Sequence, residues 1–348
     1  MQKYHGNPII TTDMVAPSNP GLVVKGALNP GAIQFRDETL LLLRVAEGCI
    51  QTPGSISIPV YDFTTPQSEM RVMEFDENDP DVQLKDNRAI AVGDKEYVST
   101  LSHLRLARSH NGVDFKIDRA PFWTPCNASE EFGVEDARIT RIEDTWFINY
   151  TAVSGDSYGT SLLKTTDFKT VEYLGMIFAA PNKDVCIFPE KINGAYVALH
   201  RPFNHGFGKS SIWMAKSPDL IHWGQHQCLL RPRANEWEDE KIGGGAPPIK
   251  TPKGWLVIYH GKSLRNGVDY YSLMVLLLDL NDPSRILYQG EHPILEPSES
   301  YETNGFVPNV VFLNGIVQTG NDALSLYYSA CDEVVCLAQC SINELIPH

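Results

Sequence analysis

Charged residues stand singly within apolar segments at several distant points of the sequence. Arg44 lies in LLLRVAE, Asp136 in GVEDARIT and Arg201 near the end of YVALHRP. A buried ion is costly unless it is paired or faces a wet pocket. A local ion pair would explain any single case: Arg44 could meet Glu47, and Asp136 could meet Arg138. Because the pattern recurs along the whole chain, we predict that these residues line one shared pocket.

Four possible cations among these residues indicate an anion site. They are Lys183, Arg201, Lys241 and His260, in a chain whose formal net charge is -14. Phosphate suits both the planar fork of an arginine and the point charge of a lysine. We therefore expect the four side chains to bind phosphate.

Carboxylates and aromatic rings in the same segments suit a sugar. Asp136 and Asp332 could bind sugar hydroxyls or donate a proton. Aromatic side chains offer flat apolar faces on which sugar rings stack, although we expect most of them to pack in the core. The candidates are Trp123, Trp213, Trp223 and Tyr271.

Short β-rich segments separated by turns must position these side chains. Convincing amphipathic helices of ten or more residues are scarce, and 26 glycines and 23 prolines are spread along the chain. Many short strands with regular turns are typical of a sandwich, a barrel or a propeller. The clearest predicted strands are TWFINYTAV (145–153), AYVALHR (195–201), GWLVIYHG (254–261), YSLMVLLLDL (271–280) and LSLYYSA (324–330).

A repeated pattern distinguishes among these all-β folds. A strand of small and apolar residues ends in Ser, Thr or a similar residue, and a polar turn follows. The markers Ser109, Thr165, Ser217, Asp279 and Cys340 lie 56, 52, 62 and 61 residues apart. Such a period, with about four strands per repeat, is typical of propeller blades. Although similar turns occur in ordinary hairpins, we predict a single five-bladed β-propeller domain over residues 1–348, with a central active-site pocket.

Composition and charge argue against several classes of protein. The 348 residues are 43% hydrophobic and 21% charged, as in ordinary globular proteins. An acidic chain without a basic tract is a poor binder of nucleic acid or of an anionic membrane. No apolar run approaches the roughly 20 residues of a membrane-spanning helix. The N-terminal segment has no secretory pattern, so we expect a cytoplasmic location if the numbered start is the true start.

Cysteine spacing and short motifs point to neither a metal site nor a nucleotide site. The seven cysteines include no CxxC pair, and we expect reduced thiols that are mostly buried. The glycine run at 243–245 is followed by Ala-Pro-Pro and is not a P-loop. We therefore predict that no metal is bound.

A series of motifs between residues 27 and 335 follows the order found in one known family. They are ALNPG (27–31), LLLRVAE (41–47), SHLRLARS (102–109), GVEDARIT (133–140), FPEKINGAYVALHRP (188–202), SPDLIHWG (217–224), KIGGGAPPIKT (241–251), GWLVIYHG (254–261), VPNVVF (307–312) and YYSACDEVV (327–335). Together they resemble glycoside hydrolase family 130, the five-bladed propeller enzymes that act as β-mannoside phosphorylases and mannosidases. YYSAC and GGGAPP differ from the more usual YYGAA and GAGPPP, which leaves substrate length open.

The resemblance implies roles for nine residues. Those matching positions around the mannosyl unit are Asn29, Arg44, Asp136 and Asp332, and Asp136 matches the general acid. Those matching phosphate-binding positions are Lys183, Arg201, Lys241, His260 and Tyr271. The first phosphate-binding position of the family is usually an arginine or lysine next to an amide residue or an aspartate. Lys183 next to Asp184 is an acceptable variant of that pair. The resemblance implies no cofactor, and inorganic phosphate is consumed as the second substrate.

The long segment between Arg44 and Ser102 resembles one subgroup of the family. It includes SISIPVYDF and LKDNRAIAV. A long segment at this place is similar to that of the enzymes that act on β-1,2-linked mannobiose and manno-oligosaccharides. A β-mannoside oligosaccharide and phosphate are therefore the expected partners, and association into a homo-oligomer is left open.

The resemblance implies an inverting phosphorolysis. Asp136 would protonate the glycosidic oxygen, directly or through the mannosyl 3-hydroxyl, while phosphate attacks C1 from the opposite face to give α-mannose 1-phosphate and a shortened acceptor.

Two alternatives stay open at this point. An inverting β-mannosidase would need a second carboxylate as base, for which Glu190, Glu236 and Glu238 are candidates. A non-catalytic propeller that binds glycans or proteins would need neither Asp136 nor the cations.

Overall fold

Nearly all regular structure in the protein is β-strand, as predicted. The computed structural model describes residues 1–64, 69–85, 88–203, 206–234 and 236–346. The helical segments within these ranges are single short turns: η1 (Thr12–Met14), η2 (Ala128–Glu130), α1 (Ser300–Thr303) and α2 (Ile342–Leu345). No helix among the described residues is both long and apolar enough to cross a membrane.

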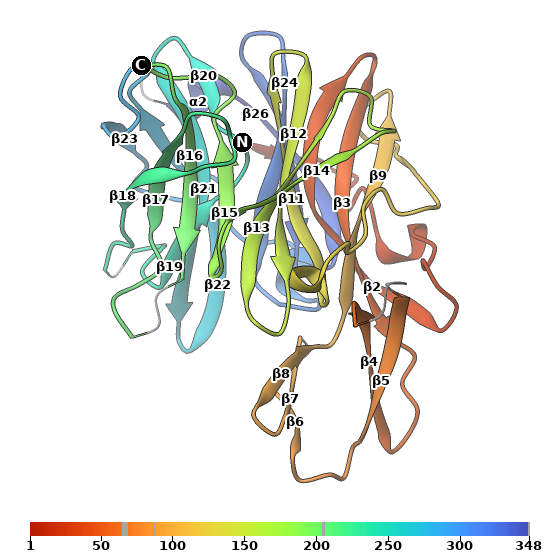
Figure 1. Ribbon diagram of the computed structural model, residues 1–348. Helices are drawn as coiled ribbons and strands as arrows, with labels where there is room; N and C mark the ends of the chain where they lie inside the picture. Colours follow the sequence, from red (N-terminus) through yellow and green to blue (C-terminus); the bar gives the residue numbers. More distant parts are fainter. Residues whose placement is uncertain (65–68, 86–87, 204–205, 235, 347–348) are drawn as a thin grey trace.

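The body of the protein consists of five antiparallel meanders (Figure 1). The first contains β2 (Leu22–Phe35), β3 (Glu38–Cys49), β9 (Leu101–Ser109) and β10 (Lys116–Ile117). The second contains β11 (Gly133–Ile142), β12 (Thr145–Val153), β13 (Tyr158–Thr165) and β14 (Glu172–Phe178). The third contains β15 (Asn182–Ile187), β16 (Tyr196–Pro202), β17 (Ile212–Ser217) and β18 (Gly224–Leu230). The fourth contains β19 (Lys241–Gly244), β20 (Ile249–Thr251), β21 (Gly254–Arg265), β22 (Val268–Leu278) and β23 (Ile286–Gln289). The fifth contains β24 (Val311–Thr319), β25 (Ala323–Ala330), β26 (Val334–Ser341) and β1 (Gln2–Lys3).

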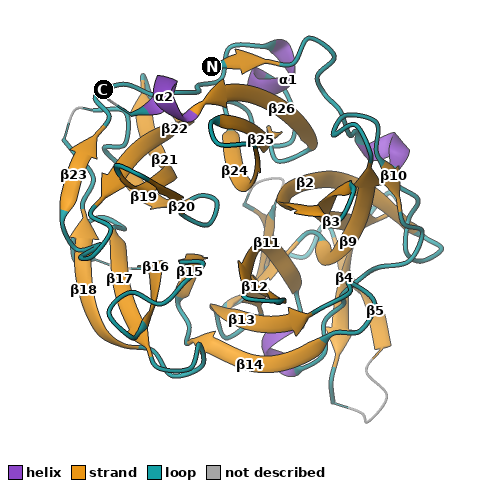
Figure 2. Ribbon diagram, turned by 90° about the horizontal axis from the view of Figure 1, so that it is seen from above, coloured by secondary structure: helices purple, strands orange, loops and turns teal. Residues whose placement is uncertain are grey.

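The meanders are arranged around a common centre. Seen from above, β2, β11, β15 and β24 lie toward the middle and β14, β18 and β23 lie at the periphery (Figure 2). The first two meanders form one eight-stranded sheet, joined by the parallel pair Gly133 and Ser102. The fifth meander is completed by the other end of the chain, because β1 pairs with β26 with Lys3 opposite Ala338. The N-terminal and C-terminal segments are therefore held in one sheet.

The repeated sequence marker is a structural repeat. Ser109, Thr165 and Ser217 are the last residues of β9, β13 and β17, and Asp279 directly follows β22. Each of these side chains accepts a hydrogen bond from a backbone N–H two or three residues further on, which closes the turn. Cys340 in β26 differs, because its neighbour Ser341 accepts the corresponding bond.

Hydrophobic clusters fill the space between neighbouring meanders. In β3, Leu41 and Leu43 pack toward the fifth meander, whereas Leu40 and Leu42 pack toward the second. Successive side chains of a strand point to opposite faces. The leucine run is therefore apolar throughout because both faces of this sheet are buried.

The long segment between β3 and β9 forms two small sheets that project from one end of the body (Figure 1). Their strands are β4 (Ser55–Asp62) with β5 (Glu69–Asp76), and β6 (Val82–Leu84) with β7 (Ala89–Val92) and β8 (Lys95–Val98). A small apolar cluster that includes Ile58, Ile90 and Phe132 anchors both sheets to the body. The sequence motif LKDNRAIAV falls partly on residues 86 and 87, which lie outside the described residues.

Candidate active site

A cavity of about 400 Å³ lies where the five meanders meet. All nine residues singled out from the sequence line it: Asn29, Arg44, Asp136, Lys183, Arg201, Lys241, His260, Tyr271 and Asp332. They come from all five meanders and from widely separated parts of the sequence. The predicted shared pocket is therefore confirmed, whereas the role of each residue within it stays a prediction.

Irregularities in the innermost strands direct three polar side chains to this cavity. Asn29, Asp136 and Asp184 have φ angles of 43°, 53° and 55°. Each lies where the register of β2, β11 or β15 shifts against its neighbour. Such bulges change the direction of a side chain, and Asn and Asp tolerate the left-handed backbone better than most residues.

Asp136 lies in a network with Asn29 and Arg44. Asn29 Nδ2 donates a hydrogen bond to Asp136 Oδ1 at 2.8 Å, and Arg44 Nη1 lies 3.4 Å from the same oxygen. The other guanidinium nitrogen, Nη2, is 2.7 Å from Glu135 Oε1. The local pair of Arg44 with Glu47 is therefore wrong: Glu47 instead lies 3.6 Å from His103.

Glu135 is a cavity residue that the sequence analysis missed. In a regular strand Glu135 and Asp136 would point to opposite faces, but the bulge between residues 135 and 138 lets both line the cavity. Burial raises the pKa of Glu135, although Arg44 opposes this shift. Burial also raises the pKa of Asp332. Arg44 therefore pairs with two carboxylates, Glu135 and Asp136, and a third, Asp332, is close enough to affect it electrostatically.

Asp184 organises the cations at the other end. Its Oδ2 lies 2.6 Å from Arg201 Nε and 3.4 Å from His260 Nε2, and its Oδ1 lies 3.2 Å from Arg138 Nη2. Burial alone would raise the pKa of Asp184, but the guanidinium groups of Arg201 and Arg138 hold it well below its ordinary value. The carboxylate is therefore ionised, and it fixes Arg201, the cation that lines the cavity beside it.

The two lysines lie over aromatic rings. Lys183 Nζ is 5.2 Å from the centre of the Tyr158 ring, and Lys241 Nζ is 5.1 Å from that of Tyr271. Burial, together with Arg201 and Lys183, lowers the pKa of Lys241 to about 7. Lys241 therefore exchanges its proton near neutral pH.

His260 is neutral at pH 7. Burial lowers its pKa to about 3, although Asp184 opposes this shift. Its Nδ1 atom is buried and has no hydrogen-bond partner within the described part of the chain. The neutral imidazole contributes no charge, so the site has fewer permanent cations than the sequence indicated.

Gly243 provides the space for this arrangement. A Cβ atom at this position would lie 2.3 Å from Asp184 Oδ2 and 2.7 Å from His260 Nε2. A side chain would therefore displace both groups. GGGAPP differs from the usual family pattern GAGPPP, but both have glycine at the position of Gly243.

Two of the four predicted aromatic platforms, Trp123 and Trp223, pack against the core, whereas Trp213 borders a separate surface depression. Tyr271 lines the cavity. Trp123 donates to Tyr150 Oη, and Trp223 stacks on Phe178. An apolar wall that the sequence analysis did not identify is formed by Phe306, Val307, Val310 and Phe312. Phe306 and Val307 belong to the loop before β24, which carries no periodic pattern.

Two other polar residues in the sequence motifs, His200 and Arg138, lie outside the cavity wall. His200 contacts Asn182 and His226 and does not line the cavity. Arg138 donates to the backbone carbonyl of Asp136, so the predicted carboxylate pair between these two residues is wrong.

The three glutamates that could serve as base in the alternative hydrolase also lie outside the cavity. Glu190 pairs with Lys250 at the surface, and Glu238 pairs with Arg233. Glu236 borders a separate depression. None of the three lines the cavity. Glu135 and Asp332 are the additional carboxylates next to Asp136.

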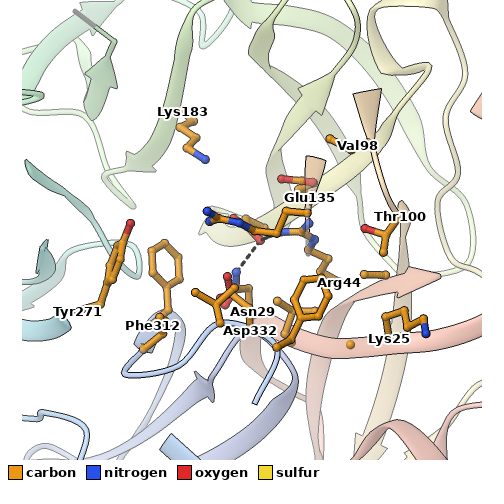
Figure 3. Close-up of a pocket in the computed structure, with 18 of the residues that line it drawn as sticks. Lys25, Asn29, Arg44, Val98, Thr100, Glu135, Lys183, Tyr271, Phe312 and Asp332 are labelled. Atoms are coloured by element: carbon orange, nitrogen blue, oxygen red, sulfur yellow. Dashed lines mark hydrogen bonds and ion pairs between the residues drawn. The ribbon is translucent and has the colours of Figure 1, made fainter. Parts of the chain in front are cut away.

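The projecting sheets contribute to the cavity. Arg88, Glu96 and Val98 line it, together with Thr100, which follows β8. Val98, Thr100 and Lys25 lie on the same side of the cavity (Figure 3). Within the described ranges, no group of three or more His, Cys, Asp or Glu side chains is arranged to hold a metal ion. Five of the seven cysteines are buried, whereas Cys126 is exposed and Cys228 is half-buried, and all are free thiols.

Comparison with known proteins identifies the family. The family model of glycoside hydrolase family 130, described as beta-1,4-mannooligosaccharide phosphorylase, matches residues 69–347. The chain belongs to this family.

Two curated relatives carry more specific names. A beta-1,2-mannobiose phosphorylase of Listeria innocua is 43% identical over 99% of this chain and 97% of that protein. A 1,2-beta-oligomannan phosphorylase of Thermoanaerobacter is 36% identical over 72% of this chain and 82% of that protein. A solved structure of the Listeria innocua beta-1,2-mannobiose phosphorylase in complex with beta-1,2-mannobiose has a TM-score of 0.93 at 42% identity, covering 99% of this chain and 97% of that one.

Proposed function

We propose that this protein is a glycoside phosphorylase that cleaves β-1,2-linked mannobiose or short manno-oligosaccharides with inorganic phosphate. The observation that carries the proposal is the shared cavity, in which Asp136 and Arg44 are accompanied by the cations Lys183, Arg201 and Lys241. An inverting hydrolase needs a base for water and has no use for an anion site. The names of the two relatives support the β-1,2 linkage.

Asp136 is the proposed general acid. Asn29 and Arg44 both contact its Oδ1, which fixes the carboxyl group and leaves Oδ2 to carry the proton. The proton passes to the glycosidic oxygen, directly or through the mannosyl 3-hydroxyl, as the bond from that oxygen to C1 breaks. Asn29, Arg44 and Asp332 bind the mannosyl unit in this proposal.

Phosphate is the proposed nucleophile. Lys183, Arg201 and Lys241 neutralise its charge, and His260 and Tyr271 add hydrogen bonds. One phosphate oxygen forms a bond to C1 on the face opposite the leaving oxygen, so the β-linkage becomes α-mannose 1-phosphate. The acceptor leaves with the proton from Asp136, and no cofactor takes part.

The fold supports a five-bladed β-propeller formed by one domain over residues 1–348. Each meander is then one blade, and β1 closes the last blade. The cytoplasmic location expected from the sequence stays a prediction.

A comparison of substrates tests the linkage. Initial rates of mannose 1-phosphate formation are measured with β-1,2-mannobiose, β-1,2-mannotriose and β-1,4-mannobiose at equal concentration with phosphate in excess. The β-1,2-linked substrates should react faster. A preference for the β-1,4-linked disaccharide would contradict the proposed substrate.

A further inference from the structure

Arg138 lies behind the residues that line the cavity. It is 1% exposed, and it is not itself a lining residue. Its guanidinium donates four hydrogen bonds to residues of three different meanders. The acceptors are the carbonyl of Asp136 at 3.0 Å, the carboxylate of Asp184 at 3.2 Å, and the carbonyls of Gly244 and Gly245 at 3.1 and 2.9 Å.

The bond to Asp136 restrains the backbone of the proposed acid. Asp136 has a left-handed backbone at a bulge, where its N–H and C=O groups leave the regular ladder. A buried carbonyl without a partner is costly. Because Arg138 binds this carbonyl through a planar group with several fixed donors, it restricts rotation of the peptide that carries Asp136.

The bond to Asp184 restrains the proposed phosphate site. Asp184 uses Oδ2 for Arg201 and His260, so Arg138 is the partner of Oδ1. Removing one partner of a buried ion pair leaves an uncompensated charge. Without the Arg138 guanidinium, Asp184 would turn toward the remaining cations and compete with phosphate for Arg201.

We propose that Arg138 is a positioning residue that holds Asp136 and the cluster of Asp184 and Arg201 in a fixed relative arrangement. The inference rests on the proposed function, because it assigns these two groups to the acid and to phosphate. Arg138 touches neither substrate and acts through its bonds to both groups.

Arg105 is a matched control. It is also completely buried within a strand of the body, but it binds the carbonyl of Ala16 and the ring of His103 and does not line the cavity. Replacement of either arginine by lysine should lower the melting temperature. A purely structural role for Arg138 predicts that both variants, when folded, retain normal kinetics.

The test is steady-state kinetics of Arg138→Lys and Arg105→Lys, with phosphate and β-1,2-mannobiose each varied. For Arg138→Lys we expect kcat to fall and the KM for phosphate to rise, each by about tenfold, as for loss of a charge-assisted contact. The KM for mannobiose should change little, because Arg44 and Asn29 remain in place. Arg105→Lys should have kinetics close to those of the wild type. Normal kcat and normal phosphate KM in a folded Arg138→Lys enzyme would overturn the inference.

A second variant keeps the inference testable if Arg138→Lys does not fold. Asp184→Asn retains Arg138 but weakens its link to the phosphate site. We expect kcat to remain reduced even at saturating phosphate, because the acid and the bound phosphate are no longer held together. Wild-type kcat at saturating phosphate would overturn the proposed coupling. Failure of the proposed function is distinguishable, since the wild-type enzyme would then form no mannose 1-phosphate.

Discussion

The carboxylate of Asp184 lies 2.6 Å from the guanidinium of Arg201, measured from Oδ2 to Nε, and both groups line the central cavity. The ion pair is therefore part of the cavity wall. This arrangement combines two interpretations of Arg201 that the sequence left as alternatives. Arg201 is paired with a buried carboxylate, and it also stands where a bound anion would reach it.

Replacement of Arg201 by alanine should weaken phosphate binding more than sugar binding. Loss of a charge-assisted contact costs about 1.5–3 kcal/mol, which is about ten- to hundredfold in the KM for phosphate. Asp184 retains Arg138 and His260, so the variant should fold. Steady-state kinetics with each substrate varied measure the effect, and Arg141→Ala at the exposed end of β11 is the control. Equal losses for both substrates would contradict a phosphate-specific role.

Asp136→Asn should remove most activity and leave the fold intact. General acid catalysis contributes about 10²–10⁴-fold, and asparagine can still accept from Asn29 and Arg44. Turnover of β-1,2-mannobiose and a melting curve are the two measurements. The control is Asp156→Asn, in the exposed turn between β12 and β13. Turnover near that of the wild type would exclude Asp136 as the acid.

Anion binding should weaken as pH rises through about 7. The pKa of Lys241 is lowered to about 7 by burial and by the neighbouring cations, so the lysine is charged below this pH and neutral above it. A bound anion favours the charged form and moves the transition to higher pH. Sulfate is a suitable probe, because its own charge is constant across the neutral range.

The inhibition constant of sulfate against phosphate should therefore increase from about pH 6 to about pH 9, on either side of the lysine transition. In Lys241→Met the constant should be higher at the acidic end of this range and should depend less on pH. The same pH dependence in both proteins would show that another group is responsible.

Gly243→Ala should disturb the phosphate site without touching the sugar residues. The added Cβ would lie 2.3 Å from Asp184 Oδ2, closer than any tolerated contact, and the buried carboxylate would have to move. We expect a rise of about tenfold or more in the KM for phosphate. Gly224→Ala is the control, because a Cβ added there would have no other atom within 4 Å. A normal phosphate KM for Gly243→Ala would argue against the role assigned to Asp184.

The strands and the shared cavity could be predicted from the sequence because both leave a local signal. The strand TWFINYTAV coincides with β12. The consecutive leucines of β3 indicate that both faces of this strand are buried. Single charges within such runs, such as Arg44 and Arg201, indicated a common pocket, and the family motifs then supplied the individual roles.

Other features depend on contacts that no local pattern encodes. Glu135 enters the cavity only because a bulge breaks the alternation of β11. The network of Arg138 with Asp184 and Gly245 joins segments that are far apart in the chain, and a sequence does not indicate which buried carboxylate meets which guanidinium. Local pairing within one strand, such as Arg44 with Glu47, failed for the same reason.

The dependence of cleavage on phosphate decides between phosphorolysis and hydrolysis. The protein is freed of phosphate and incubated with β-1,2-mannobiose, with and without added phosphate, while mannose 1-phosphate is followed by phosphorus NMR and free mannose by an enzymatic assay. With phosphate, we expect one mannose 1-phosphate of α configuration for each mannose released; without phosphate, we expect no cleavage. Release of two mannose molecules per disaccharide at the same rate under both conditions would contradict it.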